Sequence, residues 1–299
     1  MRIRWIVMCA ACGVLIALGP GPLSPYGAMI AWTLLLQGTF ALSYDILGGY
    51  GGELHLGHGS FFGIGVYTSA LAITHGAAWW WAVPAAGLAG GAAAGLFYPL
   101  LVPLRGVPFA LVSLGLLLSC GLLARNLAGI TGGTAGLSLP SAFDMDGPYL
   151  WSILLFAGTL WVHDSIPDSR FGRALCAAAV DPEAAASSGV PTGHVRGRAL
   201  VLGAVAAALA GGIYPLPMAY VSPQSAFGLE VALAPVVAVL LGGPASRWGP
   251  LLGVVLYTGL QEWLWTRGWQ WSLAMTGMGL MAAGVFLPRG LAGLVSGSR

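Results

Sequence analysis

Residues 170–189 read RFGRALCAAAVDPEAAASSG, a charged and capped segment in a chain that is otherwise largely apolar. Asp181 suits the N-cap of a short helix, Pro182 its first position, and Glu183 the positive end of its dipole. Gly189 can end that helix, after about one and a half to two turns, in the left-handed conformation. The side chains left for a partner are all small, namely Ala184, Ala185, Ala186, Ser187 and Ser188. The sequence therefore predicts a short helix whose surface of small side chains binds in a groove on another protein.

The composition indicates a membrane protein. The 299 residues are 57% hydrophobic and only 7% charged, and the mean hydropathy is +0.83. Ordinary soluble domains carry about 25% charged residues. A membrane-spanning helix takes about 20 residues, so the chain has room for on the order of ten spans with short connections. We expect an all-α, polytopic integral membrane protein with about ten transmembrane segments, some broken or short, in one domain over 1–299.

Ten apolar runs are the candidates for these segments. They lie at 5–18, 29–47, 61–74, 79–102, 107–124, 149–162, 199–214, 229–241, 250–265 and 269–287. Small residues recur at every fourth position in two of the runs, at 87, 91 and 95 and at 199, 203, 207 and 211. This spacing places them on one helix face, which predicts close helix packing within the membrane.

The arginines are distributed unequally if all ten runs cross and the N-terminus is cytoplasmic. Ten then lie inside, namely Arg2, Arg4, Arg105, Arg170, Arg173, Arg196, Arg198, Arg247, Arg289 and Arg299, against Arg125 and Arg267 outside. The positive-inside rule predicts this asymmetry, which favours cytoplasmic N- and C-termini and a cytoplasmic loop at about 163–198. A cleaved signal peptide is the competing interpretation of the N-terminus. The prolines at 20, 22 and 25 favour a turn after a first span.

Residues 48–59, GGYGGELHLGHG, are too rich in glycine for a regular apolar helix, and three of their side chains are ionisable. Irregular backbone at membrane depth is tolerated only inside protein or along a water-filled cavity. Ionisable groups in a span are candidate functional residues by default. We therefore expect the translocation path beside this segment, with Glu230 as a further acidic candidate. The path candidates are Glu53, His55, Gly57, His58 and Glu230.

Each of these residues also has a structural alternative. His55 and His58, three residues apart, have the spacing of two metal ligands, but no third ligand is evident, so packed, hydrogen-bonded histidines are favoured over a metal site. Glu53 can cap a helix that begins near Ser60 or meet water at the cytoplasmic mouth. Glu230 can be a solvated residue at a helix start. These alternatives stay open at the level of sequence.

Several classes of catalytic protein are disfavoured. The chain has no lysine, which removes the lysine of a nucleotide-binding P-loop and the Schiff-base lysine of several enzyme classes. Paired catalytic carboxylates, a Ser-His-Asp order and a basic nucleic-acid patch are also not evident. Cys9 and Cys12 lie one turn apart in an apolar run, and Cys120 and Cys176 are isolated, so no disulfide framework is indicated.

The motifs together resemble the permeases of ABC importers, specifically the branched-chain amino acid permease family of the LivM type. Residues 170–175 and 183–189 are similar to the cytoplasmic coupling loop of those permeases. Residues 57–67, GHGSFFGIGVY, resemble the family's LGHxxFFGIGAY segment, and residues 131–137 its periplasmic-side Thr-Gly-Gly loop. Further matching blocks follow in the family order, at 221–223, 241–250 and 286–291. The resemblance extends from about 41 to 294.

The resemblance implies a non-catalytic permease subunit in the bacterial inner membrane, which transports branched-chain or other small amino acids. Its implied partners are a second permease subunit, two cytoplasmic ATPases that hold ATP and Mg²⁺, and a periplasmic substrate-binding protein. The chain itself is expected to bind no cofactor, metal or nucleic acid. The residues expected to couple it to the ATPases are Arg170, Arg173, Asp181, Glu183, Ala184, Ala185 and Gly189.

The chain departs from the family pattern at the candidate path. His55 stands where a serine is usual, Glu53 is unusual, and Ala234 replaces a common glutamate, with Glu230 one helical turn earlier. These departures affect which solute is transported and not the fold. Urea or short-amide permeases resemble the same family, so a urea or short-amide permease is an alternative. A proton-coupled secondary transporter that uses Glu53, His55 and His58 is an alternative of another class, disfavoured by the coupling loop. A membrane-embedded enzyme is a third class, for which the chain shows no catalytic constellation.

Overall fold

The computed structural model describes residues 24–139, 145–266 and 290–291, and these are almost entirely helical. The longer helices are α2 (Pro25–Gly48), α3 (Gly59–Thr74), α4 (Trp79–Leu101), α5 (Gly106–Asn126), α7 (Asp146–Ser165), α10 (Thr192–Ile213), α13 (Leu229–Gly242) and α14 (Gly249–Thr266). The shorter elements are α6 (Ala128–Thr131), η1 (Gly133–Ala135), α8 (Arg170–Val180), α9 (Pro182–Ser187), α11 (Pro215–Met218) and α12 (Pro223–Phe227). The predicted all-α class is confirmed.

Within the described residues, five helical stretches are long and apolar enough to cross a membrane: Pro25–Gly48, Trp79–Leu101, Gly106–Asn126, Thr192–Met218 and Pro223–Gly242. Helix α3 is apolar but shorter. Each predicted run between residues 29 and 265 coincides with one of the longer helices, to within a few residues at most ends. The largest difference is α10, which begins at Thr192 and not at Ala199. The runs at 5–18 and 269–287 lie outside the described residues, so the number of about ten spans stays a prediction.

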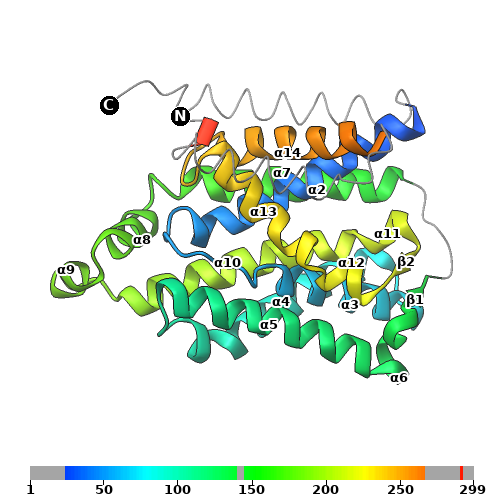
Figure 1. The fold of residues 1–299 in the computed structure, drawn as a ribbon, viewed down its shortest axis with the longest axis horizontal. Coiled ribbons are helices and arrows are strands. Elements are labelled where there is room, and N and C mark those ends of the chain that lie inside the picture. The colour runs from blue at the N-terminus through cyan, green and yellow to red at the C-terminus, as the bar shows by residue number, and fades with distance from the viewer. Residues whose placement is uncertain (1–23, 140–144, 267–289, 292–299) are drawn as a thin grey trace.

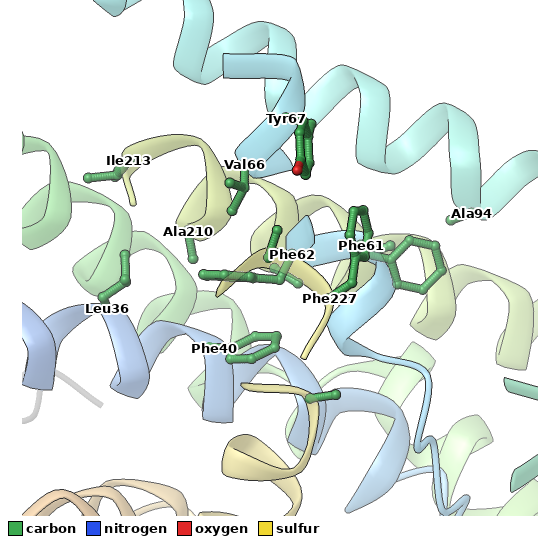
Figure 2. Packing of buried hydrophobic residues seen from close by; sticks show 14 of the residues in the cluster. Leu36, Phe40, Phe61, Phe62, Val66, Tyr67, Ala94, Ala210, Ile213 and Phe227 are labelled. Atoms are coloured by element: carbon green, nitrogen blue, oxygen red, sulfur yellow. The ribbon is translucent and has the colours of Figure 1, made fainter. Parts of the chain in front are cut away.

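Helix α10 is the central element, because it packs against α2, α3 and α4. Small residues allow this approach, in part as predicted: a Cβ on Gly211 would lie 2.1 Å from the Phe62 carbonyl and one on Gly87 2.7 Å from the Leu209 side chain, whereas one on Gly95 would meet no atom within 4 Å. Around these contacts the core is aromatic, with Phe40, Phe61, Phe62 and Phe227 gathered between α2, α3 and α12 (Figure 2).

The two ends of the helix bundle differ (Figure 1). Helices α8 and α9 lie at one end, and α6, α11 and a two-stranded ribbon lie at the other. In the ribbon, β1 (Leu137–Ser138) pairs antiparallel with β2 (Tyr220–Val221). Of the arginines in the described residues, Arg125 bonds to Gln224 at the ribbon end. The other arginines of the described residues belong to α8 (Arg170 and Arg173), to the start of α10 (Arg196 and Arg198) and to the α4–α5 and α13–α14 connections (Arg105 and Arg247). Within the described residues the arginines are therefore segregated as predicted.

Candidate functional site

The predicted capped helix is present as α9, at one end of the molecule (Figure 1). Oδ1 of its N-cap, Asp181, accepts hydrogen bonds from the amides of Glu183 and Ala184, both at 3.0 Å. Gly189 has a φ of +84°, the left-handed region that glycine adopts without strain, and its amide donates to the Ala186 carbonyl. Because both ends of α9 are fixed by local hydrogen bonds, the helix has a defined shape before any partner binds.

Apart from Glu183, the exposed side chains of α9 are small, but one residue predicted to be among them is buried. Ala184, Ala186, Ser187 and Ser188 are exposed, whereas Ala185 is buried. The prediction that Ala185 faces a partner was therefore wrong. A helix of this length must turn one face toward the protein, and in α9 that position packs inward and anchors the helix.

Helix α8 attaches α9 to the rest of the protein. The side chains of Leu175 and Ala178 are buried, and the Ser169 hydroxyl caps the helix by accepting a hydrogen bond from the Gly172 amide at 2.9 Å. Arg170 and Arg173 lie on the exposed side, where Arg173 donates to the Asp168 carbonyl at 2.9 Å. The two arginines therefore lie on the surface in the first turn of α8, at the end of that helix away from α9.

A buried ion pair joins the glycine-rich segment to α10. Arg196, in the first turns of α10, places Nη2 at 2.7 Å from Oε1 of Glu53. The same guanidinium donates to the carbonyls of Val102 and Leu104, and Oε2 of Glu53 accepts from the Gly106 amide at 3.2 Å. One pair of side chains therefore holds together segment 49–58, the connection between α4 and α5, and α10.

The position of Glu53 differs from both of its sequence alternatives. Helix α3 begins at Gly59, and its N-cap residue, His58, makes no side-chain capping bond. Glu53 therefore does not cap α3, and with a side chain only 9% exposed it is not a solvated residue at a mouth. Burial of a charge is costly unless it is paired and hydrogen-bonded, which explains why Arg196 lies against it.

His55 and His58 lie packed together in the protein interior, and of the two only His58 is hydrogen-bonded through its ring as the structural alternative predicts. Their ring centroids are 5.4 Å apart, and both side chains are almost fully buried. Nε2 of His58 is 2.9 Å from the Ser43 hydroxyl, and its ring stacks on Phe40 at 5.5 Å. His58 is therefore held by both a hydrogen bond and an aromatic contact.

His55 is bound differently from His58. Its ring packs against Phe61 and Phe109, at centroid distances of 5.8 and 5.3 Å. Neither of its ring nitrogens has a hydrogen-bond partner among the described residues. A buried polar group without a partner costs about 1–3 kcal/mol. His55 is thus the polar side chain of this segment that has capacity for a further hydrogen bond.

Gly57 is required by a close approach between segment 49–58 and α5. A Cβ at this position would lie 1.9 Å from the Ser113 carbonyl oxygen, and the Gly57 amide donates to the Ser113 hydroxyl at 3.2 Å. Any larger residue would push the segment away from α5. Gly57 therefore sets the position of the neighbouring histidines.

Glu230 is separate from this cluster. It is exposed in the first turn of α13, whereas Glu53, His55 and His58 are buried. Ala234, one turn later, is also buried. The structure therefore groups Glu53, His55, Gly57 and His58 and leaves Glu230 on the surface, apart from them.

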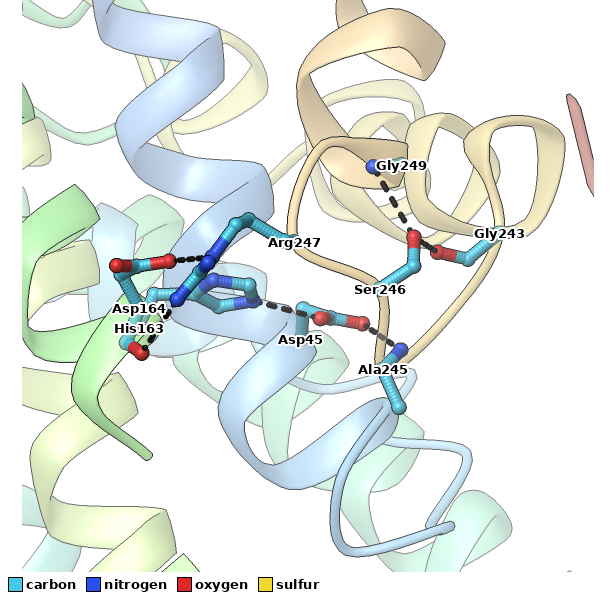
Figure 3. A network of polar contacts seen from close by, with 8 residues as sticks. All are labelled: Asp45, His163, Asp164, Gly243, Ala245, Ser246, Arg247 and Gly249. Carbon is cyan, nitrogen blue, oxygen red and sulfur yellow. Dashed lines mark hydrogen bonds and ion pairs between the residues drawn. The ribbon is translucent and has the colours of Figure 1, made fainter. Parts of the chain in front are cut away.

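A second buried polar network joins three other helix ends (Figure 3). Nε2 of His163, in the last turn of α7, is 2.7 Å from Oδ2 of Asp45 in α2, and both side chains are fully buried. Oδ1 of Asp45 accepts from the Ala245 amide at 3.0 Å, in the connection from α13 to α14. In the same connection, Arg247 forms an ion pair with Asp164.

Sequence reasoning missed these residues and also the partner of Glu53. One signal was available, because Asp45 interrupts the apolar run at 29–47 and an ionisable residue within a span is a functional candidate by default. His163 and Arg196 lie at or beyond the ends of apolar runs, where polar residues are ordinary. Their pairing over more than a hundred residues leaves no local pattern in the sequence.

Comparison with known proteins gives a family and two kinds of relative. Residues 27–284 match the family model described as "Branched-chain amino acid transport system / permease component". The chain is 28% identical to the high-affinity branched-chain amino acid transport system permease proteins LivM of Salmonella typhimurium and Escherichia coli, over 88% of this chain and 72% of each relative. It is 30% identical to the autoinducer 2 import system permease protein LsrC of Yersinia pseudotuberculosis, over 66% of this chain and 58% of the relative. No solved structure matches.

Proposed function

The chain belongs to the permease-component family of branched-chain amino acid transport systems, and on that premise we propose that it carries branched-chain or other small amino acids across a bacterial inner membrane. It is a multi-pass membrane protein and a permease subunit of an ABC transporter, a class that works with ATPase and binding-protein components. We propose in addition that it pairs with a second permease, that two cytoplasmic ATPases hold the ATP and Mg²⁺, and that the α9 end is cytoplasmic.

The observation that carries the coupling mechanism is the path from α9 to the buried polar cluster. Four residues, 188–191, separate the end of α9 at Ser187 from the start of α10 at Thr192. Arg196 lies within the first two turns of α10 and bonds to Glu53. His55 lies two residues after Glu53 in the sequence. A docking element on the surface and a polar segment in the interior are therefore joined by one helix and one ion pair.

This arrangement can transmit a rigid-body movement. Closure of the ATPase pair would displace α9, and α10 would follow because its start is joined to α9 by a short connection. Segment 49–58 would then move with α10, because Arg196 is paired with Glu53. The connection between α4 and α5 would move as well, because the same guanidinium binds the carbonyls of Val102 and Leu104. Packed helices commonly switch between discrete arrangements in this way.

Segment 53–58 is our candidate for the wall of the translocation path. Its backbone is irregular inside protein, which is the setting that such backbone requires at membrane depth. His55 supplies unpartnered ring nitrogens that water or the polar groups of a passing solute can satisfy. The path would open beside His55 when α10 carries Glu53 away from its present position.

The solute has three candidates. The LivM relatives are named for branched-chain amino acids, and the LsrC relatives for autoinducer 2. Urea and short amides are the third, because His55 and Ala234 depart from the pattern of the amino-acid permeases. We favour amino acids, because the LivM relatives match over more of this chain than the LsrC relatives do.

Uptake by a reconstituted transporter tests this choice. The full chain is placed in vesicles with its partner permease, ATPases and binding protein, and uptake of radiolabelled leucine, urea, acetamide and autoinducer 2 is measured with ATP. We expect leucine uptake, with the other solutes near the level found without ATP. Selective uptake of autoinducer 2 or of an amide would replace the amino-acid assignment and leave the permease class intact.

A further inference from the structure

A cavity of about 590 Å³ opens between α4, α8 and α10, near the start of α10. Tyr98 and Phe171 form two of its walls, Val201 and Leu202 form its apolar part, and His194 and Arg198 are its ionisable side chains. The Tyr98 ring lies directly against Gly197, where a Cβ would come within 1.8 Å of it. No acidic side chain lines the cavity in the part of the chain that the structure describes.

The polarity of the cavity changes along α10. His194, Arg198 and Leu202 recur at every fourth position, so they lie on one face of the helix in the order basic, basic, apolar. His194 and Arg198 are near the helix start, whereas Val201 and Leu202 lie deeper in the candidate span Thr192–Met218. Phe171 comes from α8, which belongs to none of the candidate spans. The cavity therefore extends from the edge of the membrane into it.

The charge of this site is not neutralised within the described residues. Arg196, two positions earlier, is paired with Glu53, but Arg198 is exposed and has no ion pair or hydrogen bond to the described part of the chain. The start of α10 adds to the positive potential, since no side chain caps its first amides.

We propose that this cavity binds an anionic phospholipid, with the headgroup phosphate at Arg198 and His194 and an acyl chain against Val201 and Leu202. Basic pockets between helices at the membrane edge attract anionic headgroups. The apolar part at acyl-chain depth distinguishes a lipid from a soluble anion, which would use only the basic rim. Only the membrane location of the chain is needed here, so the proposed solute and ATPases are not involved.

Native mass spectrometry of the purified full chain tests the lipid site. The protein is titrated with phosphatidylglycerol and with phosphatidylcholine of the same acyl chains. Arg198→Ala removes the charge and Arg198→Lys keeps it. Arg170→Ala is the matched control, because Arg170 is an exposed arginine at the same end that does not line the cavity. Val201→Trp fills the apolar part, and glycerol phosphate serves as a soluble competitor without acyl chains.

We expect preferential binding of phosphatidylglycerol, weakened about fivefold by Arg198→Ala, the factor that corresponds to about 1 kcal/mol per basic side chain near an anionic surface. Arg198→Lys and Arg170→Ala should bind like the wild type, Val201→Trp should bind less lipid, and glycerol phosphate should not displace it. Equal binding of both lipids, equal effects of Arg198→Ala and Arg170→Ala, or displacement by glycerol phosphate would each overturn the proposal. Unchanged elution and melting temperature of the variants show that folding is intact.

Discussion

Arg196 and Glu53 are 143 residues apart in the sequence, yet Nη2 of the arginine lies 2.7 Å from Oε1 of the glutamate in the protein interior. The pair joins α10, which follows the short surface helix α9, to the irregular segment that carries His55 and His58. A buried ion pair adds little net stability over a well-packed apolar pair, but breaking one partner is costly. The position of the pair therefore suits a mechanical connection between α10 and segment 49–58 better than a contribution to the free energy of folding.

We predict that Arg196→Ala destabilises the chain by about 3–5 kcal/mol, because Glu53 would be left buried and unpaired. The double variant Glu53→Leu with Arg196→Met should recover most of this loss while transport stays impaired. The free energy of unfolding in a micellar denaturant titration measures both effects. Arg125→Ala is the control, since that side chain is exposed at the opposite end of the molecule. A stable, fully active Arg196→Ala variant would contradict the role of the pair.

The second prediction concerns the orientation of the chain. A single cysteine at Ser187, in α9, should react with an impermeant maleimide only after the cells are opened, because we place α9 in the cytoplasm. A cysteine at Thr134, exposed at the opposite end, is the matched control and should react in intact cells. The native cysteines are first replaced by serine so that only the introduced cysteine can react. Burial already slows the reaction of the Cys176 thiol with maleimide, because it raises the pKa of that thiol. Labelling of position 187 in intact cells would reverse the topology.

The third prediction concerns the shape of α9. Asp181→Ala removes the N-cap, which typically costs about 1 kcal/mol, and Gly189→Val places a β-branched residue at a φ of +84°. Both changes should weaken ATPase binding and ATP-driven uptake while the membrane-embedded part stays folded. Co-purification of the ATPases and uptake per ATP hydrolysed are the measurements. Ser188→Ala, an exposed neighbour, should have little effect, and equal effects of all three would show that α9 needs no defined shape.

The fourth prediction concerns His55. Replacement by serine, the residue that the amino-acid permeases usually have, should change the ratio of uptake rates between solutes by about two- to tenfold, the range expected for one hydrogen bond. His55→Phe keeps the ring and removes both nitrogens. It should lower uptake even though an apolar ring suits the contacts with Phe61 and Phe109. If His55→Phe raises stability and leaves the uptake profile unchanged, His55 is structural filling.

The helices and the docking segment were predictable because their signals are local. Apolar runs mark α2 to α5, α7, α10, α13 and α14, and the Asp181 cap and the left-handed Gly189 act within α9 itself. The burial of Ala185 was not predictable, because it depends on which face of a two-turn helix packs against the protein.

The polar contacts were less predictable, because they join distant segments. Glu53 is unusual in the sequence, but nothing there indicates that Arg196 is its partner. Asp45 and His163 were missed, although they form a fully buried, hydrogen-bonded pair. Gly57 was assigned to the path from its motif, and the structure adds the steric reason, which is its approach to Ser113. Such pairings follow from helix packing, which local sequence patterns do not specify.

The central claim is that this chain is a permease driven by partner ATPases. The most direct test measures leucine uptake into vesicles that contain the chain alone or with all its partners, supplied either with ATP at zero proton gradient or with a proton gradient and no ATP. We predict uptake only with the complete set of partners and ATP, unaffected by a protonophore, and no ATP hydrolysis by the purified chain alone. Uptake by the chain alone under a proton gradient would contradict this claim and would favour a secondary transporter built on Glu53, His55 and His58.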